Sequence, residues 1–162
     1  GQCVADIIGA GIIPGVMEMM DRPAIKSAEA FVQVGYPLDV EALLLVELDG
    51  PSVEVDFLIE RVREIAEALG YVSMRISENE EERLQFWAGR KAAFPAVGRV
   101  APDYYCMDGT IPRARLGEVL RGIAELSLEY GLAVANVFHA GDGNLHPLIL
   151  YNGRVDGELE RA

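Results

Sequence analysis

The stretch from Leu132 to Tyr151, LAVANVFHAGDGNLHPLILY, joins two apolar runs through a short glycine-rich segment. Leu132 to Phe138 and Leu148 to Tyr151 have the composition of β-strands. The residues from Gly141 to Asn144 are of types that tolerate positive φ or hydrogen-bond their own backbone, as a tight reversal of the chain requires. The stretch therefore predicts a β-hairpin.

The two histidines of the chain, His139 and His146, lie at the two ends of this turn. If the arms pair symmetrically, both residues sit opposite one another on one face, with Cβ atoms roughly 5 Å apart. Two imidazoles at that spacing can share a divalent cation, and Asp142 or a carboxylate from elsewhere could complete the ligand set. The spacing is also compatible with histidines that merely flank a loop, because no third ligand is evident from the sequence.

The rest of the chain alternates between strand and helix patterns. We expect further strands at 16–20, 42–48, 71–76 and 104–107, and helices at 23–32, 55–69, 77–93 and 112–130. A capping box of Ser77 and Glu80 opens the third of these helices, and Pro95 and Gly98 end it. This order suits either a doubly wound parallel sheet or ferredoxin-like units with an antiparallel sheet.

The composition indicates one globular domain over residues 1–162. The chain is 51% hydrophobic and 25% charged, which is enough to bury a core. The apolar stretch from Ile7 to Met20 is broken by glycines and a proline and has no basic leader, so it predicts neither a signal peptide nor a membrane span. Cys3 and Cys106 show no zinc or disulfide spacing. We therefore expect a soluble, cytoplasmic protein.

The charge is strongly acidic overall but unevenly distributed. A net charge of -12 argues against nucleic acid as a partner, because phosphates would be repelled. Between Arg83 and Arg115 the balance reverses, and an anionic ligand would be drawn to such a segment. The alternative is that these basic side chains are solvated or paired with acidic neighbours.

Four segments in order carry a resemblance to a known family. His139-Ala-Gly-Asp-Gly-Asn-Leu-His146 resembles the HxGDGNxH signature of FAD-linked oxidases of small 2-hydroxy acids, which include glycolate oxidase, D-lactate dehydrogenase and D-2-hydroxyglutarate dehydrogenase types. Glu18-Met-Met-Asp21, Trp87-Ala-Gly-Arg90-Lys91 and the segment from Pro102 to Pro112 resemble further parts of the glycolate oxidase type. The resemblance identifies residues 1–162 as the C-terminal cap and substrate domain of this family.

The resemblance implies an α+β fold of ferredoxin-like units, with an antiparallel sheet and helices packed on one face. It also implies that FAD is held mainly by an N-terminal domain that this chain lacks, so we expect the chain alone to be inactive. The missing FAD-binding domain is then the main partner. A second flavin-like subunit and an iron–sulfur subunit are further partners that the family implies.

The resemblance assigns roles to four residues. Arg90 would anchor the substrate carboxylate, since a guanidinium matches a carboxylate bidentately. His139 and His146 would be catalytic and would hold a divalent metal such as zinc or manganese, with the third ligand beyond Ala162. Asn144 would contact the flavin or the substrate.

The expected reaction is oxidation of a small 2-hydroxy acid to the 2-oxo acid. Phe94 and Cys106 stand where the 2-hydroxyglutarate enzymes have polar residues for a distal carboxylate, which favours glycolate or D-lactate. A non-catalytic module that binds a small acid or a protein is the alternative. A metal-dependent hydrolase is less well supported, because the sequence offers no evident base.

Overall fold

The computed structural model describes all residues from Gly1 to Ala162 and contains one six-stranded sheet. Every pairing in it is antiparallel, and the strand order is β2-β1-β5-β6-β3, with β4 also paired to β6. The strands are β1 (Val16–Asp21), β2 (Ala42–Glu47), β3 (Asp103–Cys106), β4 (Gly109–Thr110), β5 (Val134–His139) and β6 (Asn144–Tyr151). The α+β class with an antiparallel sheet is confirmed, and the doubly wound parallel alternative is excluded.

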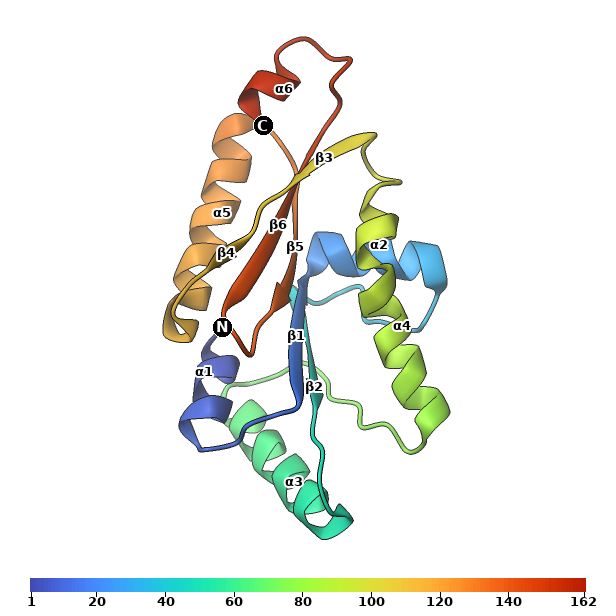
Figure 1. The fold of residues 1–162 in the computed structure, drawn as a ribbon, viewed down its shortest axis with the longest axis vertical. Coiled ribbons are helices and arrows are strands. Elements are labelled where there is room, and N and C mark those ends of the chain that lie inside the picture. Colours follow the sequence, from blue (N-terminus) through green and yellow to red (C-terminus); the bar gives the residue numbers. More distant parts are fainter.

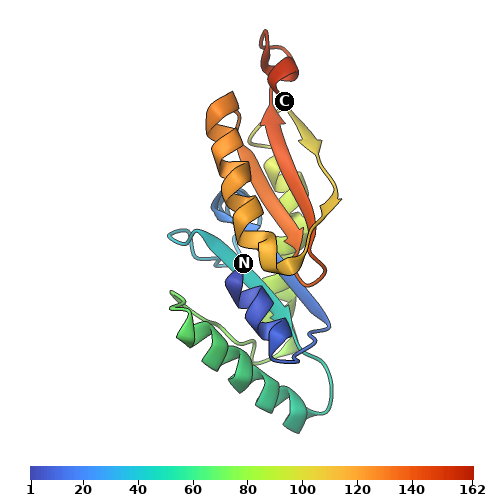
Figure 2. The same ribbon diagram turned by 90° about the vertical axis from the view of Figure 1, so that its left-hand side faces the viewer.

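The helices divide between the two faces of the sheet and do not share one face as the resemblance implied. They are α1 (Gln2–Gly9), α2 (Arg22–Val32), α3 (Ser52–Ala68), α4 (Glu80–Val97), α5 (Leu116–Tyr130) and α6 (Glu158–Arg161), with a 3-10 turn η1 (Arg113–Arg115). Figures 1 and 2 show α2 and α4 on one side of the strands and α1, α3 and α5 on the other. Strand residues alternate between these faces, so each face has an apolar layer of its own.

Two hydrophobic cores correspond to these two faces. The first packs α2 and α4 against the sheet through residues that include Ile25, Ala93 and Val137. The second packs α1, α3 and α5 against the opposite face and includes Phe138, the largest fully buried side chain. Val137 and Phe138 are adjacent in β5 and both fully buried, which shows that this central strand is covered on both sides.

The predicted hairpin is present, but its register differs from the symmetric pairing that we expected. His139 pairs with Asn144, and His146 pairs with Val137. The four residues 140–143 form the turn, and Gly143 at its end has φ 72°. A Cβ atom at Gly143 would lie 2.2 Å from the carbonyl oxygen of Ile111, so the close approach of these two segments requires glycine. The histidines are therefore diagonal neighbours on one face.

Helix α4 crosses the sheet obliquely and contacts strands in turn. Arg83 and Trp87 bond Glu47 of β2, and Arg90 bonds Glu18 of β1. Further along, the ring of Phe94 lies at 6.4 Å from that of His146 on β6. These residues recur at helical spacing on the side of α4 that faces the sheet.

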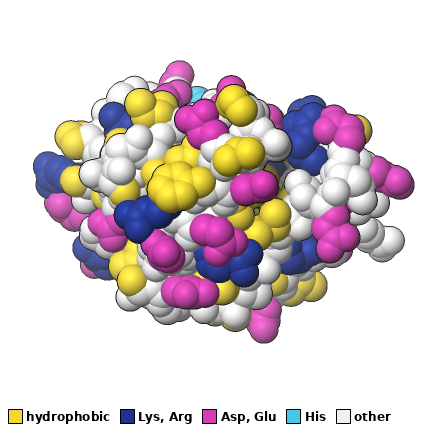
Figure 3. All heavy atoms as spheres, turned by 90° about the horizontal axis from the view of Figure 1, so that it is seen from below, with side chains coloured by type: hydrophobic (Ala, Val, Ile, Leu, Met, Phe, Trp, Pro, Cys, Tyr) yellow, Lys and Arg dark blue, Asp and Glu magenta, His cyan; other side chains and the backbone are white.

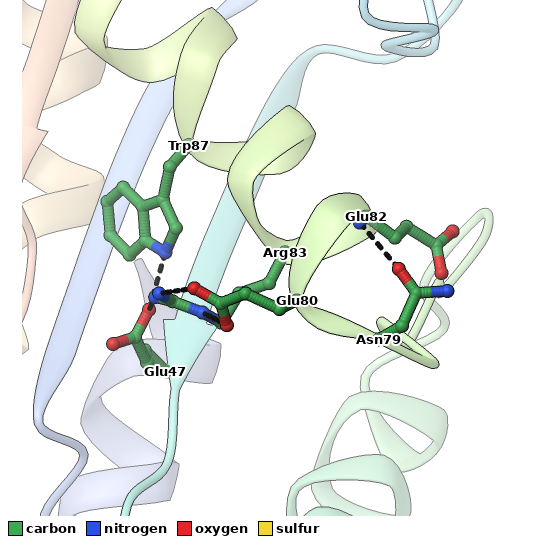
Figure 4. A network of polar contacts seen from close by, with 6 residues as sticks. All are labelled: Glu47, Asn79, Glu80, Glu82, Arg83 and Trp87. Atoms are coloured by element: carbon green, nitrogen blue, oxygen red, sulfur yellow. Dashed lines mark hydrogen bonds and ion pairs between the residues drawn. The ribbon is translucent and has the colours of Figure 1, made fainter.

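The start of α4 differs in detail from the prediction. Asn79 caps the helix by accepting the backbone N–H of Glu82, so the cap is not Ser77. Figure 4 shows this cap beside the polar network that anchors the first turns of α4 to β2. Pro95 lies inside the last turn and does not end the helix, which runs to Val97. Proline has no N–H, so at this position the helix lacks one backbone hydrogen bond but continues for two more residues.

One predicted strand is absent, and two helices, α1 and α6, were not predicted. Residues 71–76 form no regular structure, although they line an apolar groove of about 660 Å³ between β2, α3 and α4. The segment alternates like a strand, but it lines this groove and pairs with no strand, and Val72 is 75% exposed. Helix α1 begins before the apolar run from Ile7 to Met20 and overlaps it only at Ile7 to Gly9, and α6 lies in the polar stretch near Ala162.

The end of the molecule that carries α3 presents apolar and charged side chains together. In Figure 3, apolar groups occupy the middle of this face with charged groups around them. Val53 and Phe57 of α3 are among the large apolar residues that are exposed in the chain. None of the helices combines the length and apolar composition needed to cross a membrane.

Candidate functional site

Three side chains from distant segments meet on the face of the sheet that α4 covers. Arg90 donates from Nε and Nη2 to Oε2 of Glu18, at 3.1 and 2.8 Å. Nδ1 of His139 lies 2.7 Å from the other oxygen, Oε1, of the same carboxylate. Glu18 and His139 are directly opposite in the pairing of β1 with β5, so the sheet itself brings them together.

The depth of these groups differs sharply. The side chains of Glu18 and Arg90 are only 7% and 10% exposed, whereas that of His139 is 46% exposed. A buried charge needs a partner, and Glu18 and Arg90 supply one to each other. The cluster therefore has a buried ion pair at its bottom and a half-exposed imidazole at its edge.

Tyr36 and Gly89 set how closely the chain packs beside Arg90. The hydroxyl of Tyr36 donates to the backbone carbonyl of Phe86 in α4. A Cβ atom at Gly89 would lie 2.2 Å from the Tyr36 ring, so only glycine lets this ring lie against the helix. Burial raises the pKa of Tyr36 to about 12, which keeps its hydroxyl a hydrogen-bond donor at neutral pH.

The second histidine adjoins the first at right angles. The ring centroids of His139 and His146 are 5.3 Å apart, with an interplanar angle of 88°. The side chain of His146 is 16% exposed, and its Nδ1 is 3.8 Å from Oδ1 of Asp108, which is itself largely exposed. The hairpin thus brings the two imidazoles together although they are not directly opposite.

The residues of this chain do not make a complete metal site. No group of three or more His, Cys, Asp and Glu side chains is arranged to hold a metal ion. Asp142, which the sequence suggested as a ligand, lies in the turn, where its backbone N–H donates to the carbonyl of His139. Two imidazoles supply only two of the four ligands that zinc requires.

Asn144 is placed beside His139 as its direct cross-strand partner. The Oδ1 atom of Asn144 is buried and accepts no hydrogen bond. A buried acceptor without a donor is unfavourable by about 1–3 kcal/mol, and such exceptions are often found at sites that bind a ligand. This orphaned oxygen suits a ligand that brings an N–H or O–H group.

The basic segment between Arg83 and Arg115 is largely neutralised within the chain. Arg83 pairs with Glu47 and Glu80, and Arg115 pairs with Glu118. Arg113 donates to the backbone carbonyl of Gly141, and Arg99 lies over the ring of Phe31. These arginines are therefore paired or packed within the chain and do not form a free basic surface.

Glu18 is the member of the cluster to which the sequence analysis gave no role. It appeared there only as the first residue of a family-like segment. A glutamate among Val16, Met17 and Met19 in a strand pattern was the available signal, because a buried carboxylate in an apolar strand demands a cationic or donor partner. The structure supplies two such partners, Arg90 and His139.

Comparisons with known proteins place this chain in a family. Residues 1–162 match the model of the FAD linked oxidases, C-terminal domain. The chain is 59% identical over its whole length to the glycolate oxidase subunit GlcD of Escherichia coli (strain K12), covering 32% of that protein. It is 34% identical over 99% of its length to GlcD of Bacillus subtilis (strain 168), covering 34% of it. It is 28% identical over 93% of its length to a D-lactate dehydrogenase of Anaerostipes hadrus, covering 33% of it. The chain thus spans about a third of the length of these curated relatives. The chain belongs to the family of FAD linked oxidases, C-terminal domain.

Proposed function

We propose that this chain is the substrate-binding cap domain of an FAD-dependent enzyme that oxidises a small 2-hydroxy acid to the 2-oxo acid. The observation that carries the proposal is the convergence of Arg90 and His139 on Glu18, with His146 alongside. Such a reaction needs a cation for the substrate carboxylate and a group that takes the hydroxyl proton. Both kinds of group meet in this cluster.

In the proposed mechanism, Arg90 binds the carboxylate through Nη1, which makes no hydrogen bond within the chain. His139, whose ring is half exposed, accepts the proton of the substrate hydroxyl, and His146 orients that hydroxyl. FAD supplies the acceptor for the hydride when it is bound. The unpaired Oδ1 of Asn144 would accept an N–H of the flavin ring.

The surroundings of the histidines support a monocarboxylate substrate. Phe94 faces His146 edge-on, and Cys106 lies on β3 opposite Leu148 of β6. Neither side chain offers a cation for a second carboxylate. We therefore propose glycolate or D-lactate rather than a dicarboxylic acid.

A divalent ion such as zinc or manganese on His139 and His146 is an alternative to direct proton transfer to His139, because a ring nitrogen that binds an ion cannot also accept a proton, and it needs further ligands from outside this chain. The missing FAD-binding domain or a segment beyond Ala162 would supply them. Elemental analysis of the chain and of the longer flavoprotein tests this point. We expect little metal in the chain alone and about one ion per chain in the longer protein, because each ligand added orients the others.

The partners proposed for the chain are the FAD-binding domain, a second flavin-like subunit and an iron–sulfur subunit. The Escherichia coli relative is itself named a subunit of glycolate oxidase. We also propose a cytoplasmic location, since both cysteines are free thiols, which suits a reducing compartment.

The decisive experiment is anaerobic flavin reduction in the longer protein that carries the FAD-binding part. Glycolate, D-lactate, L-lactate and D-2-hydroxyglutarate are mixed with the enzyme, and flavin absorbance is followed. We expect glycolate or D-lactate to bleach the flavin fastest, and the chain alone to be colourless and inactive. Binding of these acids without bleaching by any of them would support the non-catalytic module instead.

A further inference from the structure

Both oxygens of the Glu18 carboxylate contact residues that have a proposed role. Oε1 contacts His139, and Oε2 receives both donors of Arg90. The carboxylate is 7% exposed, so water does not compete for it. Its backbone is fixed between β2 and β5, where Glu18 pairs with Leu45 and His139. Glu18 is therefore held more rigidly than a side chain in a loop would be.

The pairing of Glu18 with Arg90 determines which ring nitrogen of His139 carries the proton. An ionised carboxylate has no proton to donate, so Glu18, in its ion pair with Arg90, is an acceptor at both oxygens. The contact between Oε1 and His139 then requires a proton on Nδ1. The neutral ring consequently carries its lone pair on Nε2, for which the chain provides no hydrogen bond.

The same carboxylate also selects which edge of Arg90 is free. Nε and Nη2 both bond Oε2, and Nη1 has no partner in the chain. Nη1 is not among the buried unpaired atoms, so it reaches solvent. One carboxylate thus leaves one basic nitrogen on His139 and one donor group on Arg90 available to a ligand.

We propose that Glu18 is the positioning residue of this site, which fixes the Nδ1–H tautomer of His139 and the exposed Nη1 edge of Arg90. Glu18 does not touch the substrate. The role rests on the proposed function, because it prepares the proton acceptor and the carboxylate anchor of that reaction. The tautomer itself can be tested without any activity.

The first test is ¹⁵N NMR of the histidine rings in the 162-residue chain, at a pH where the rings are neutral. The chain has two histidines, so the spectrum contains two rings to assign. We expect Nδ1–H and an unprotonated Nε2 for His139. The Nε2–H tautomer in the parent chain would overturn the proposal, even if every variant failed to fold.

Glu18→Gln then makes the test sharper. Its carboxamide oxygen must face Arg90, which only donates, so its NH₂ group must face Nδ1 of His139. Nδ1 becomes an acceptor, and the ring proton moves to Nε2. We expect the tautomer of His139 to invert in this variant, while an unchanged tautomer in a folded variant would overturn the proposal.

Glu47→Gln is the matched control. Glu47 also ties a strand to α4, through Arg83 and Trp87, but it contacts neither histidine. The variant removes the same charge and leaves the neutral tautomer of His139 as it is in the parent. Inversion in both variants would show that charge or folding, and not the contact of Glu18, sets the tautomer.

Flavin reduction in the longer protein gives the second readout. We expect Glu18→Gln to lower the rate of bleaching at saturating substrate on the order of 100-fold, since the basic nitrogen of His139 is lost. Glu47→Gln should keep the parent rate within about twofold. An unchanged rate with an inverted tautomer overturns the functional role of Glu18. If the tautomer inverts but no 2-hydroxy acid bleaches the parent flavin, the positioning by Glu18 stands and the proposed function is wrong.

Discussion

Helix α4 is joined to the sheet by two carboxylate–arginine pairs that use the same chemistry at different depths. Arg83 bonds Glu47 on β2, and Arg90, seven residues or about two turns further on, bonds Glu18 on β1. The side chains of the first pair are 38% and 33% exposed, and those of the second are 10% and 7% exposed. The comparison therefore sets one type of ion pair at two depths.

The two pairs also differ in what else they contact. Arg83 is shared between Glu47 and Glu80, and Trp87 donates to Glu47 as well, as Figure 4 shows. Glu80 lies at the start of α4, and its pairing with Arg83 lowers the pKa of its carboxyl. At Glu18 the additional contact is His139. The exposed pair thus holds the start of α4 against β2, whereas the buried pair aligns Arg90 and His139 of the candidate site.

The largest effect expected from this difference is on stability. Glu18→Ala leaves the buried guanidinium of Arg90 without a counter-charge, and we expect a loss of roughly 3 kcal/mol in the free energy of unfolding. Glu47→Ala should cost under about 1 kcal/mol, because its partner stays hydrated. Urea unfolding of both variants measures the two losses. Equal losses would mean that burial does not distinguish the pairs.

The next effect is on turnover in the longer flavoprotein. Arg90→Lys keeps the positive charge next to Glu18 but replaces the planar fork with a point charge. We expect kcat/KM to fall on the order of 100-fold with a change in stability within about 1 kcal/mol. Arg83→Lys is the control and should leave kcat/KM within about twofold. Parent kinetics in the Arg90 variant would exclude this residue as the anchor.

Elements with strong periodicity were predictable from the sequence, and elements that depend on a neighbour were not. The apolar stripes of α3 and α5, and Gly131 as the left-handed end of α5, follow from helical spacing and from the freedom of glycine. Residues 71–76 show the limit, since alternation describes an amphipathic segment but does not name its pairing partner. The division of helices between two faces depends on tertiary packing in the same way.

The closeness of the candidate residues on the hairpin was predictable from the sequence, but their hydrogen-bond partners were not. The glycine-rich turn brings His139, His146 and Asn144 together, as the resemblance implied, yet the register places His139 opposite Asn144. The turn has four residues, whereas direct pairing of His139 with His146 would need six. The residue types in the segment do not determine how many of them form the turn. The contact of Arg90 with Glu18 joins residues 72 positions apart in the sequence, and no local pattern encodes such a pairing.

A third carboxylate, Asp21, extends the comparison to a partly buried group without a cationic partner. Burial raises its pKa above the usual value of 3.8, although hydrogen bonds from Asn136 and Ala24 oppose this shift. A raised carboxyl pKa means that the folded state binds the proton more tightly. Ionisation of Asp21 therefore reduces stability at neutral pH, and this cost disappears as pH falls from the raised pKa to 3.8.

Asp21→Asn tests this sign. Asparagine also caps helices, so the cap on α2 is kept, and the unpaired Oδ1 of Asn136 can turn to accept the new amide N–H. We expect the variant to be as stable as the parent at neutral pH, or more stable by up to about 1 kcal/mol. Unfolding curves at several pH values should show its advantage shrinking toward pH 3.8. An advantage that grows on acidification contradicts the raised pKa.

The smallest effect concerns the exposed pair and its dependence on salt. In Arg83→Ala, Glu47 and Glu80 both lose a partner, but solvent replaces it, so we expect the melting temperature to fall by less than about 3 °C. The Debye length falls from about 10 Å at 0.1 M salt to about 3 Å at 1 M. The difference between this variant and the parent should therefore nearly vanish at high salt, whereas the loss in Glu18→Ala should persist, because buried pairs are screened much less. Thermal unfolding of parent, Arg83→Ala and Glu18→Ala at both salt concentrations gives the comparison directly. A salt-independent loss in Arg83→Ala would mean that the pair of Arg83 and Glu47 is as shielded from solvent as the pair of Arg90 and Glu18. Burial would then not distinguish the pair that holds the start of α4 from the pair that aligns the site.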